Sequence, residues 1–500
     1  MATLSSPAAP ALAAPSQASG LAAFRVTLAV VAVVTAARVL FIATAPLELD
    51  FEEAQYWHWA QQLAWGYYSK PPLVAWLIAA TTGLFGDGEG AVRLASPLLR
   101  GATALAVWGI ARRLGGPRLA AWSAIAYATL PGIWLSASLI TTDVPLLLFW
   151  ALALYCLVRR RDGGGRGWSL ACGLAIGAGL IAKYAMLYFV PCALLYLVVD
   201  PSARRRISLA DDGLALAVAA LCLAPNLAWN LAHGFATLRH TADNANLGRL
   251  RFELSEVASF VGAQLGLMGP VLFGFLLAGA AGHPSDDAMR SNRRLLVCFS
   301  LPLILLIVVA ATLSRAHPNW AAPAYVAGTI LAVEAGLRWR WRWLLPAALS
   351  GNALAGAAIC AALVLVPALP LPQGRTVELG ARFSGWRELG RDVAAALGAE
   401  PGMTLLVERR SLLALLSYYA RPAPRLLEWN PGAVVADQFT LNASLEPGAA
   451  GPFLLVATEP SPEALGHFSE VEPGARPTIV PAPGIERRYW LFVLRGFKGY

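Results

Sequence analysis

Long apolar runs that alternate with short arginine-rich segments constrain the fold of this chain more than any other feature. Hydrophobic residues make up 57% of its 500 residues and charged residues only 14%, and the mean hydropathy is +0.56. An ordinary soluble domain carries about 25% charged residues. The chain is therefore expected to be an all-α polytopic membrane protein.

The apolar runs predict about eleven transmembrane helices, since a helix needs roughly 20 apolar residues to cross a bilayer. The expected spans are 22–44, 91–111, 119–136, 144–158, 168–182, 186–199, 214–231, 257–281, 295–313, 320–337 and 343–366. Together they form a transmembrane domain of residues 21–370. Residues 1–20, rich in Ala, Pro and Ser, predict a disordered cytoplasmic tail.

The distribution of arginine predicts the orientation. A net charge of +9 would suit nucleic-acid binding, but the arginines cluster in alternate loops, as in the cytoplasmic loops of membrane proteins. The clusters lie at 112–118, 159–161, 204–206, 290–294 and 338–342. An odd number of spans then places residues 371–500 on the outer side of the membrane.

Residues 371–500 predict a small α/β domain. Helix-like segments at 385–397 and 411–420 alternate with strand-like segments at 403–407, 452–457 and 489–494, and Pro and Gly separate them. The predicted fold is thus a helical membrane domain with a C-terminal α/β periplasmic domain.

The outer loop, residues 45–76, is rich in polar residues, which are rare in most of the chain. Its segment LDFEEAQYWHWAQQLAWGYYSKPPLVAW holds three carboxylates, seven Trp or Tyr residues and a Lys-Pro-Pro sequence. Tryptophan and tyrosine settle at the headgroup level of a bilayer. We therefore interpret the loop as lying on the outer face of the membrane, with acids at one end and Lys70 at the other.

Other ionisable residues map to the same face, and such clusters in a membrane protein indicate function. A transporter would instead place them near the bilayer midplane, in two related halves of the chain, and we find no such repeat. The residues of this face are Asp50, Glu52, Glu53, Lys70, Asp143, Lys183, His240 and His317.

This one-sided group suits a reaction between a lipid phosphate and a periplasmic molecule. A carboxylate can accept a proton from an attacking hydroxyl, a role that suits Glu52 or Asp50. A lysine can hold a phosphate leaving group, a role that suits Lys70 together with Lys183. Lysine is scarce in this chain, which otherwise uses arginine, and a lysine ammonium offers a compact point charge.

Five segments together resemble one family of membrane enzymes. They are DFEEAQYWHWAQQLAWGYYSKPPLVAWL, TTDVPLLLFWALALY, IAKYAMLYFVP, PNLAWNLAHGFATLRHTADNAN and HPNWAAPAYVAG. In this order they resemble the polyprenyl-phosphate-sugar-dependent glycosyltransferases of the GT-C fold. This group includes protein O-mannosyltransferases, lipid A aminoarabinose transferases and lipopolysaccharide core galacturonosyltransferases. The resemblance covers most of the membrane region and no part of the C-terminal domain.

The resemblance implies roles for individual residues. The family's Asp-Glu-Ala triplet reads Glu-Glu-Ala here, so the catalytic carboxylate falls on Glu52, with Asp50 as the alternative. Lys70 is implied to contact the lipid phosphate, and Lys183 a phosphate or sugar. Asp143, from Thr-Asp-x-Pro, is implied to be a catalytic residue that holds the acceptor or a metal.

We also expect substrate contacts from Glu53, Tyr68, His240 and His317. The alternatives are that Glu53 is an ordinary charge at a helix N-terminus and that the two histidines only form hydrogen bonds at helix ends. No cofactor is required by the spacing. A divalent cation between Glu52 and Asp143 stays open.

The predicted function is an inverting glycosyltransferase of the inner membrane, with its active site in the periplasm. Its partners would be a polyprenyl-phosphate sugar, membrane lipids and an acceptor that is lipopolysaccharide, another glycolipid or a protein, with no nucleic acid. One alternative is a flippase or transporter of lipid-linked sugars, which forms no glycosidic bond. Another is an assembly scaffold that binds a partner through its outer domain.

Overall fold

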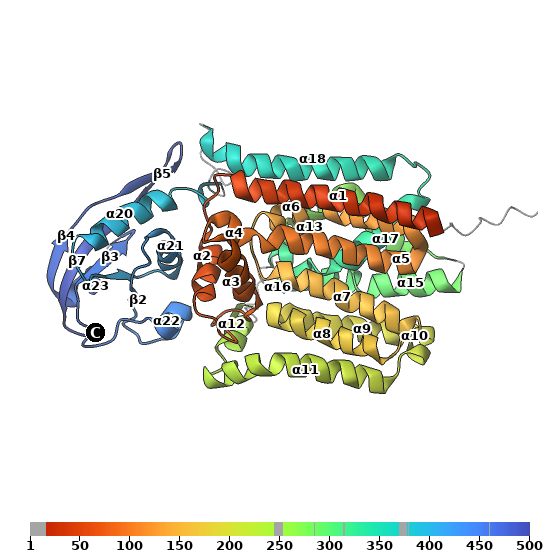
Figure 1. Ribbon diagram of the computed structural model, residues 1–500, viewed down its shortest axis with the longest axis horizontal. Helices are drawn as coiled ribbons and strands as arrows, with labels where there is room; N and C mark the ends of the chain where they lie inside the picture. Colours follow the sequence, from red (N-terminus) through yellow and green to blue (C-terminus); the bar gives the residue numbers. More distant parts are fainter. Residues whose placement is uncertain are drawn as a thin grey trace, which may run out of the picture.

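The protein consists of a bundle of helices with a smaller α/β domain at one end (Figure 1). The computed structural model describes residues 17–244, 254–284, 286–313, 316–369, 378, 380–459 and 461–500. The first helix, α1, begins at Gln17, so residues 17–20 are helical and do not belong to the tail predicted for 1–20. Residues 1–16 of that tail lie outside the described residues.

The long helices of the bundle lie side by side (Figure 1). Its elements are α1 (Gln17–Thr44), α2 (Phe51–Ala60), α3 (Leu73–Phe85), α4 (Glu89–Arg93), α5 (Ala95–Thr129), α6 (Pro131–Ala137), α7 (Asp143–Arg161), α8 (Arg166–Ala182), η1 (Tyr184–Tyr188), α9 (Phe189–Val199), α10 (Pro201–Arg206), α11 (Leu209–Ala232), α12 (Ala236–Asn244), α13 (Leu254–Met268), α14 (Pro270–Ala281), α15 (Asp287–Cys298), α16 (Leu301–Leu313), η2 (Pro318–Ala321), α17 (Ala324–Arg338), α18 (Leu344–Leu365) and η3 (Val366–Ala368).

Helix lengths support a membrane protein but do not establish eleven spans. Among the described residues, five helical stretches are long and apolar enough to cross a bilayer, and a sixth is added if α13 and α14 form one broken span. These two helices meet at 101°, so the stretch 257–281 is not the single straight helix that we expected. The expected break between 91–111 and 119–136 is present inside α5, where Gly116 has a φ of 83°, a backbone angle that favours glycine.

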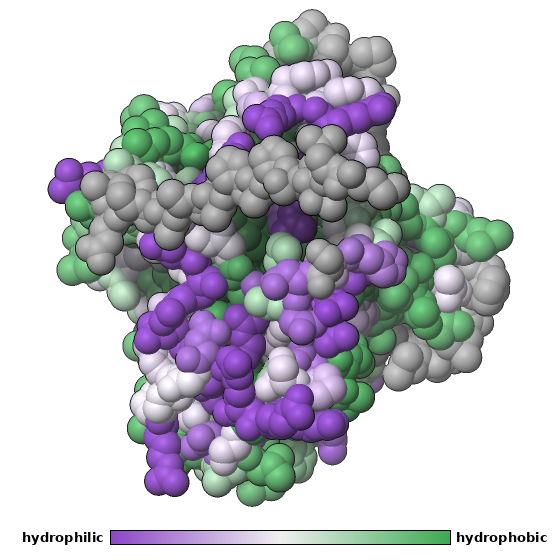
Figure 2. Space-filling view, turned by 90° about the vertical axis from the view of Figure 1, so that its right-hand side faces the viewer, coloured by the Kyte–Doolittle hydropathy of each residue, from purple (hydrophilic) through white to green (hydrophobic). Residues whose placement is uncertain are grey.

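The arginine clusters come together at the end of the bundle opposite the α/β domain. Arg161 donates to Asn292 at 2.8 Å, and Asn292 donates to the carbonyl of Leu114 at 2.8 Å. Arg160 pairs with Asp212 at 2.5 Å. Figure 2 looks onto this end, where hydrophilic residues gather. Loops that are distant in the sequence therefore share one face, as their charge predicts.

The outer loop is folded rather than spread flat on the membrane. It forms α2 and leads into α3, an apolar helix of 13 residues that we did not predict. Tyr67 stacks on Trp59 with ring centroids 4.6 Å apart, and its hydroxyl donates to the carbonyl of Trp59 at 2.9 Å. Most of the aromatic residues expected to form a headgroup belt are therefore buried: Tyr56, Trp57, Trp59 and Tyr67.

The C-terminal domain contains a five-stranded mixed sheet in the order β2-β1-β3-β7-β4, in which β2, β1 and β3 are parallel to one another and β7 is antiparallel to both of its neighbours, β3 and β4. The predicted α/β character of the domain is thus confirmed, although the strands β2, β4, β5 and β6 were not predicted. Its elements are α20 (Trp386–Gly398), β1 (Thr404–Val407), α21 (Arg410–Tyr419), β2 (Leu426–Glu428), α22 (Gln438–Asn442), β3 (Phe453–Ala457), α23 (Pro462–Gly466), β4 (Phe468–Pro473), β5 (Thr478–Ala482), β6 (Ile485–Arg488) and β7 (Trp490–Phe497).

Helix α21 docks this domain onto α2 (Figure 1). Its Tyr418 and Tyr419 belong to the same apolar core as Trp57 of α2. The Tyr419 hydroxyl also accepts a hydrogen bond from the backbone N–H of Leu49 at 2.6 Å. Since Leu49 lies just before α2, the domain is held directly against the loop that carries the predicted acids.

A buried ion pair holds the start of α2 in place. Arg93, at the end of α4, and Glu53, in α2, are 1% and 3% exposed and lie 2.6 Å apart. Arg93 also donates to the carbonyls of Leu47 and Glu48, each at 2.8 Å, and Glu53 accepts from the backbone N–H of Ile140 at 3.0 Å. The pair thus joins the loop before α2 to two other segments.

We predict that Arg93→Ala lowers the stability of the protein by about 3–5 kcal/mol, because it leaves the Glu53 carboxylate buried without a countercharge. Thermal unfolding in detergent measures the loss. Arg488→Ala, which removes an arginine from an exposed pair with Glu486, is the control and should cost at most about 1 kcal/mol. Equal unfolding midpoints for the two variants would show that the buried pair does not hold the fold.

Candidate active site

Asp143 and Lys183 meet at the end of the bundle that faces the C-terminal domain, although they lie 40 residues apart. Asp143 is the first residue of α7 and Lys183 follows the last residue of α8. The Lys183 ammonium donates to one oxygen of Asp143 at 2.7 Å, and the side-chain amide of Asn319 donates to the other oxygen at 2.7 Å. Three of the five segments that carry the resemblance therefore contribute to one cluster.

Lys70 faces the same cluster. Burial lowers the pKa of Lys70, the charges of Lys183 and Arg410 lower it further, and Glu52 and Asp143 act in the opposite direction. All four groups are therefore within electrostatic reach of its ammonium. Within the described residues the Lys70 side chain has no hydrogen bond and no ion pair, so its three N–H groups are available to a ligand.

Glu52 and Asp50 differ in the hydrogen bonds and ion pairs that their carboxylates form within the protein. Both oxygens of Asp50 accept from Arg382 at 3.0 Å, and burial raises the pKa of Asp50 although Arg382 opposes the rise. Glu52 is exposed, and its carboxylate has no hydrogen bond or ion pair with any part of the chain that the structure describes. Of the two acids, Glu52 is the one free to meet a substrate.

Glu53 is a structural residue, and our expectation that it contacts substrate is corrected. Both of its oxygens accept hydrogen bonds from Arg93, at 2.9 and 2.6 Å. The same oxygens also accept from the backbone N–H groups of Ile140 and Asp50. On a helix, consecutive residues point in different directions, so Glu53 enters the protein core while Glu52 stays on the open side of α2.

Polar residues of α11 and α12 position the loop that carries Lys70. The side-chain amide of Asn226 donates to the carbonyl of Trp65, and the hydroxyl of Thr237 donates to the carbonyl of Tyr67, both at 2.7 Å. Asn230 accepts from the backbone N–H of Thr237 at 3.1 Å and donates to the carbonyl of Asn226 at 3.0 Å. The two asparagines, spaced four apart on one helix face, therefore hold the loop as well as each other.

The other residues predicted to contact the substrate lie at the edges of the cluster that Asp143 and Lys183 form. The Tyr68 and His240 rings have centroids 5.4 Å apart, and burial lowers the pKa of His240, with smaller contributions from Lys70 and Arg410. His317 is exposed and lies two residues before Asn319, with its ring 5.4 Å from that of Trp320. The structure thus brings Tyr68 and His240 to the Lys70 side and His317 to the Asp143 side.

The prediction of site residues from the sequence did not include three buried ionisable residues. Tyr56 is buried in α2, and after burial the charges of Glu52 and Asp143 are the largest causes that raise its pKa. Two arginines inside apolar helices, Arg38 and Arg100, are 2% and 1% exposed, and Arg38 lies 4.6 Å from the centroid of the Trp134 ring. An ionisable residue within an apolar run is a signal of function, so sequence reasoning could have found the arginines.

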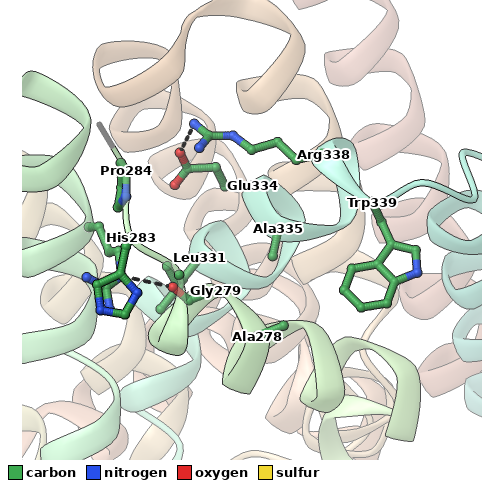
Figure 3. Close-up of a pocket in the computed structure, with 11 residues that line it drawn as sticks. Ala278, Gly279, His283, Pro284, Leu331, Glu334, Ala335, Arg338 and Trp339 are labelled. Atoms are coloured by element: carbon green, nitrogen blue, oxygen red, sulfur yellow. Dashed lines mark hydrogen bonds and ion pairs between the residues drawn. The ribbon is translucent and has the colours of Figure 1, made fainter. Parts of the chain in front are cut away.

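A cavity of about 240 Å³ lies at the opposite end of the bundle. It is lined by residues of α14 and α17, and Glu334 and Arg338 pair beside it at 2.5 Å (Figure 3). Helix α17 begins five residues after Asn319 and ends at Arg338, so its length of roughly 20 Å separates the cavity from Asn319. This cavity does not contain the predicted site residues.

A metal site is not formed by the described residues alone. Among them, no three His, Cys, Asp or Glu side chains lie close enough together to hold a metal ion. Of the two residues predicted as ligands, Glu52 has no partner in the described part of the chain, but both oxygens of Asp143 are already bound by Lys183 and Asn319. The Lys183 ammonium thus occupies the place where a cation would neutralise Asp143.

Comparisons with known proteins agree on one group of enzymes. Residues 69–229 match a family model described as dolichyl-phosphate-mannose-protein mannosyltransferase. The chain is 36% identical over 445 residues to lipid A galacturonosyltransferase RgtD of Rhizobium johnstonii, an alignment that covers 87% of this chain and 92% of that protein. It is also 32% identical over 173 residues to undecaprenyl phosphate-alpha-4-amino-4-deoxy-L-arabinose arabinosyl transferase 1 of Pseudomonas fluorescens, covering 33% of this chain and 31% of that protein.

The fold is similar to that of a solved membrane enzyme. The crystal structure of ArnT from Cupriavidus metallidurans bound to undecaprenyl phosphate has a TM-score of 0.64 against this chain, at 18% sequence identity. The match covers 94% of this chain and 97% of ArnT, so it includes both the helical bundle and the C-terminal domain.

We predict that Asp143 and Lys183 are coupled in stability. Asp143→Asn or Lys183→Met alone should cost about 2–4 kcal/mol, because each leaves a largely buried charge without its partner. The double variant should recover part of this loss, since both charges are then gone. Thermal unfolding of the four proteins measures the coupling, and strictly additive losses would contradict it.

Proposed function

Since the chain belongs to the family of GT-C-fold glycosyltransferases that includes lipid A galacturonosyltransferase RgtD, we propose that it transfers galacturonic acid from a polyprenyl phosphate to lipid A. The family membership rests on 36% identity across 92% of RgtD, and it confirms the resemblance carried by the five segments. The alternative of a flippase without bond formation loses its support, because the relatives are glycosyltransferases.

The observation that carries the proposed chemistry is that the Glu52 carboxylate and the Lys70 ammonium lie within electrostatic reach of each other and have no partner among the described residues. A general base must be able to reach the proton that it removes, and Glu52 is exposed at the start of α2. We assign Glu52 to accept the proton of the acceptor hydroxyl as this oxygen attacks the anomeric carbon of the sugar.

The leaving group in this reaction is the polyprenyl phosphate, which departs with the bonding electron pair. Lys70 is placed to hold its oxygens, because this ammonium has no partner among the described side chains. Lys183 extends the positive charge and is itself held by Asp143 at 2.7 Å. Attack from one side while phosphate leaves from the other would invert the anomeric carbon.

The proposed orientation follows from the two ends of the bundle. The arginine clusters mark one end, as shown by the contacts of Arg161 and Arg160, and such clusters are typical of cytoplasmic loops. The site and the C-terminal domain lie at the other end (Figure 1). We therefore assign them to the periplasmic side of the inner membrane, where the acceptor is lipid A.

A divalent cation between Glu52 and Asp143 is a separate proposal, which the hydrogen bonds of Lys183 and Asn319 to the two Asp143 oxygens do not favour. Assays of the purified protein after treatment with a chelator test it. A loss of transfer that added Mg²⁺ or Mn²⁺ restores would support a cation, and full activity in the chelator would contradict one.

We predict that Glu52→Gln lowers kcat by about 10²- to 10⁴-fold, the usual contribution of a general base. Lys70→Ala should lower transfer by at least about 100-fold, because the departing phosphate loses a charged donor. Both are measured as transfer of labelled sugar from polyprenyl phosphate to lipid A, with membrane insertion checked in parallel.

Asp50→Asn is the matched control for Glu52→Gln. Asp50 already binds Arg382 through both oxygens, so its replacement should lower kcat by less than about tenfold, well below the effect of losing a base. If Asp50→Asn abolishes transfer and Glu52→Gln does not, the roles of the two acids are reversed. Full activity in both Glu52→Gln and Lys70→Ala would overturn the site.

A further inference from the structure

Arg410 belongs to the C-terminal domain but faces the active site of the membrane domain. It is the first residue of α21, the helix whose Tyr418 and Tyr419 pack in one core with α2. Its guanidinium carbon lies 5.8 Å from the centroid of the Phe51 ring, and Phe51 is the neighbour of Glu52 in α2. The docking of the domain therefore places this arginine against the first turn of α2, the turn that carries the proposed base.

The charge of Arg410 acts on the other polar residues of the site. Burial is the main cause that lowers the pKa of Lys70 and of His240, and Arg410 contributes to both shifts. Burial is also the main cause that raises the pKa of Tyr68, and Arg410 opposes this rise. Lys70, His240 and Tyr68 therefore lie within electrostatic reach of the guanidinium.

Arg410 differs from the other arginines along this interface, because those are used to dock the domain. Arg382 binds Asp50, Arg387 binds Glu89 at 2.8 Å, and Arg421 donates to the carbonyl of Asp87 at 3.2 Å. Within the described part of the chain, Arg410 has neither a hydrogen bond nor an ion pair, and its guanidinium lies over the Phe51 ring.

The nearby acid of the same domain does not neutralise this charge. Burial raises the pKa of Glu428 to about 8, with a further rise from Asp437 that outweighs the opposing effect of Arg410. Among the described residues, the buried Glu428 carboxyl forms no ion pair with Arg410. As far as the described residues go, the site keeps a half-buried guanidinium whose donors have no hydrogen-bond acceptor and are available to an anion of a ligand.

The sugar of the proposed donor carries such an anion. A galacturonosyl phosphate has two negative groups, the phosphate at the anomeric carbon and the carboxylate on the far side of the sugar ring. Lys70 and Lys183 are placed for the phosphate, whereas the planar guanidinium of an arginine matches a carboxylate through two parallel hydrogen bonds. A neutral hexose would leave this arginine without a partner.

We propose that Arg410 binds the carboxylate of the uronic acid and so selects a uronate over a neutral sugar on the polyprenyl-phosphate donor. This inference rests on the proposed function, since it concerns the donor of that reaction. It makes the C-terminal domain part of the sugar site, in addition to its role in packing on the membrane domain.

Binding of two donors to the purified full-length chain, without acceptor, tests the proposal. The probes are polyprenyl phosphate galacturonate and polyprenyl phosphate galactose, which differ in the carboxylate. The unsubstituted protein should bind the galacturonate at least about 10-fold more tightly, the size expected for a charge-assisted hydrogen bond. Arg410→Gln should remove this preference and leave the affinity for the galactose donor unchanged, and Arg410→Lys should restore part of it.

Arg409→Gln is the matched control, because it removes the same charge from the adjacent, exposed position. It should keep the preference for galacturonate. Thermal unfolding of each variant checks that the C-terminal domain remains folded and docked.

Three results would overturn the proposal: no preference in the unsubstituted protein, equal losses for both donors in Arg410→Gln, or an unchanged preference in that variant. The last result is expected if Arg410 instead binds a phosphate of the acceptor. Transfer to lipid A is measured separately. If the preference depends on Arg410 but no transfer to lipid A occurs, the proposed acceptor is wrong and the role of Arg410 stands.

Discussion

The buried ion pair between Arg93 and Glu53 determines how the active site is built. Its two side chains are almost fully excluded from solvent, 2.6 Å apart, and a buried charge is tolerated only with a close partner and further hydrogen bonds. Those further bonds reach the carbonyls of Leu47 and Glu48 and the N–H of Ile140. The start of α2 is therefore held in one orientation, which turns Glu52 toward the open side of the helix.

The C-terminal domain depends on the same arrangement. Tyr419 accepts a hydrogen bond from Leu49, and Arg382 binds Asp50, so the domain docks on the residues that lead into α2. This docking engages Asp50, whereas Glu52 keeps no partner among the residues that the structure describes. It also places Arg410 next to Phe51. In our proposal, a domain that carried no recognisable motif thus contributes both to the choice of base and to the choice of sugar.

The sequence predicted the membrane domain well where the physical signal is local. Apolar runs and arginine clusters are properties of short segments, so the helices and the two ends of the bundle could be predicted from them. The break at Gly116 and the alternation of helices and strands after residue 380 are equally local. The sharp bend between α13 and α14 was missed, because both helices are apolar and nothing in their hydropathy marks the change of direction.

The sequence by itself determined which residues are available for chemistry: a few acids and lysines in a chain that otherwise avoids them, on one side of a membrane. Only the tertiary structure decided how they are used. Glu52 and Glu53 are adjacent and chemically alike, yet one is exposed and the other is buried against Arg93, because the helix turns them in different directions and distant segments supply the partner. Asp143, Lys183 and Asn319 likewise meet only through the packing of the helices, which no single segment specifies.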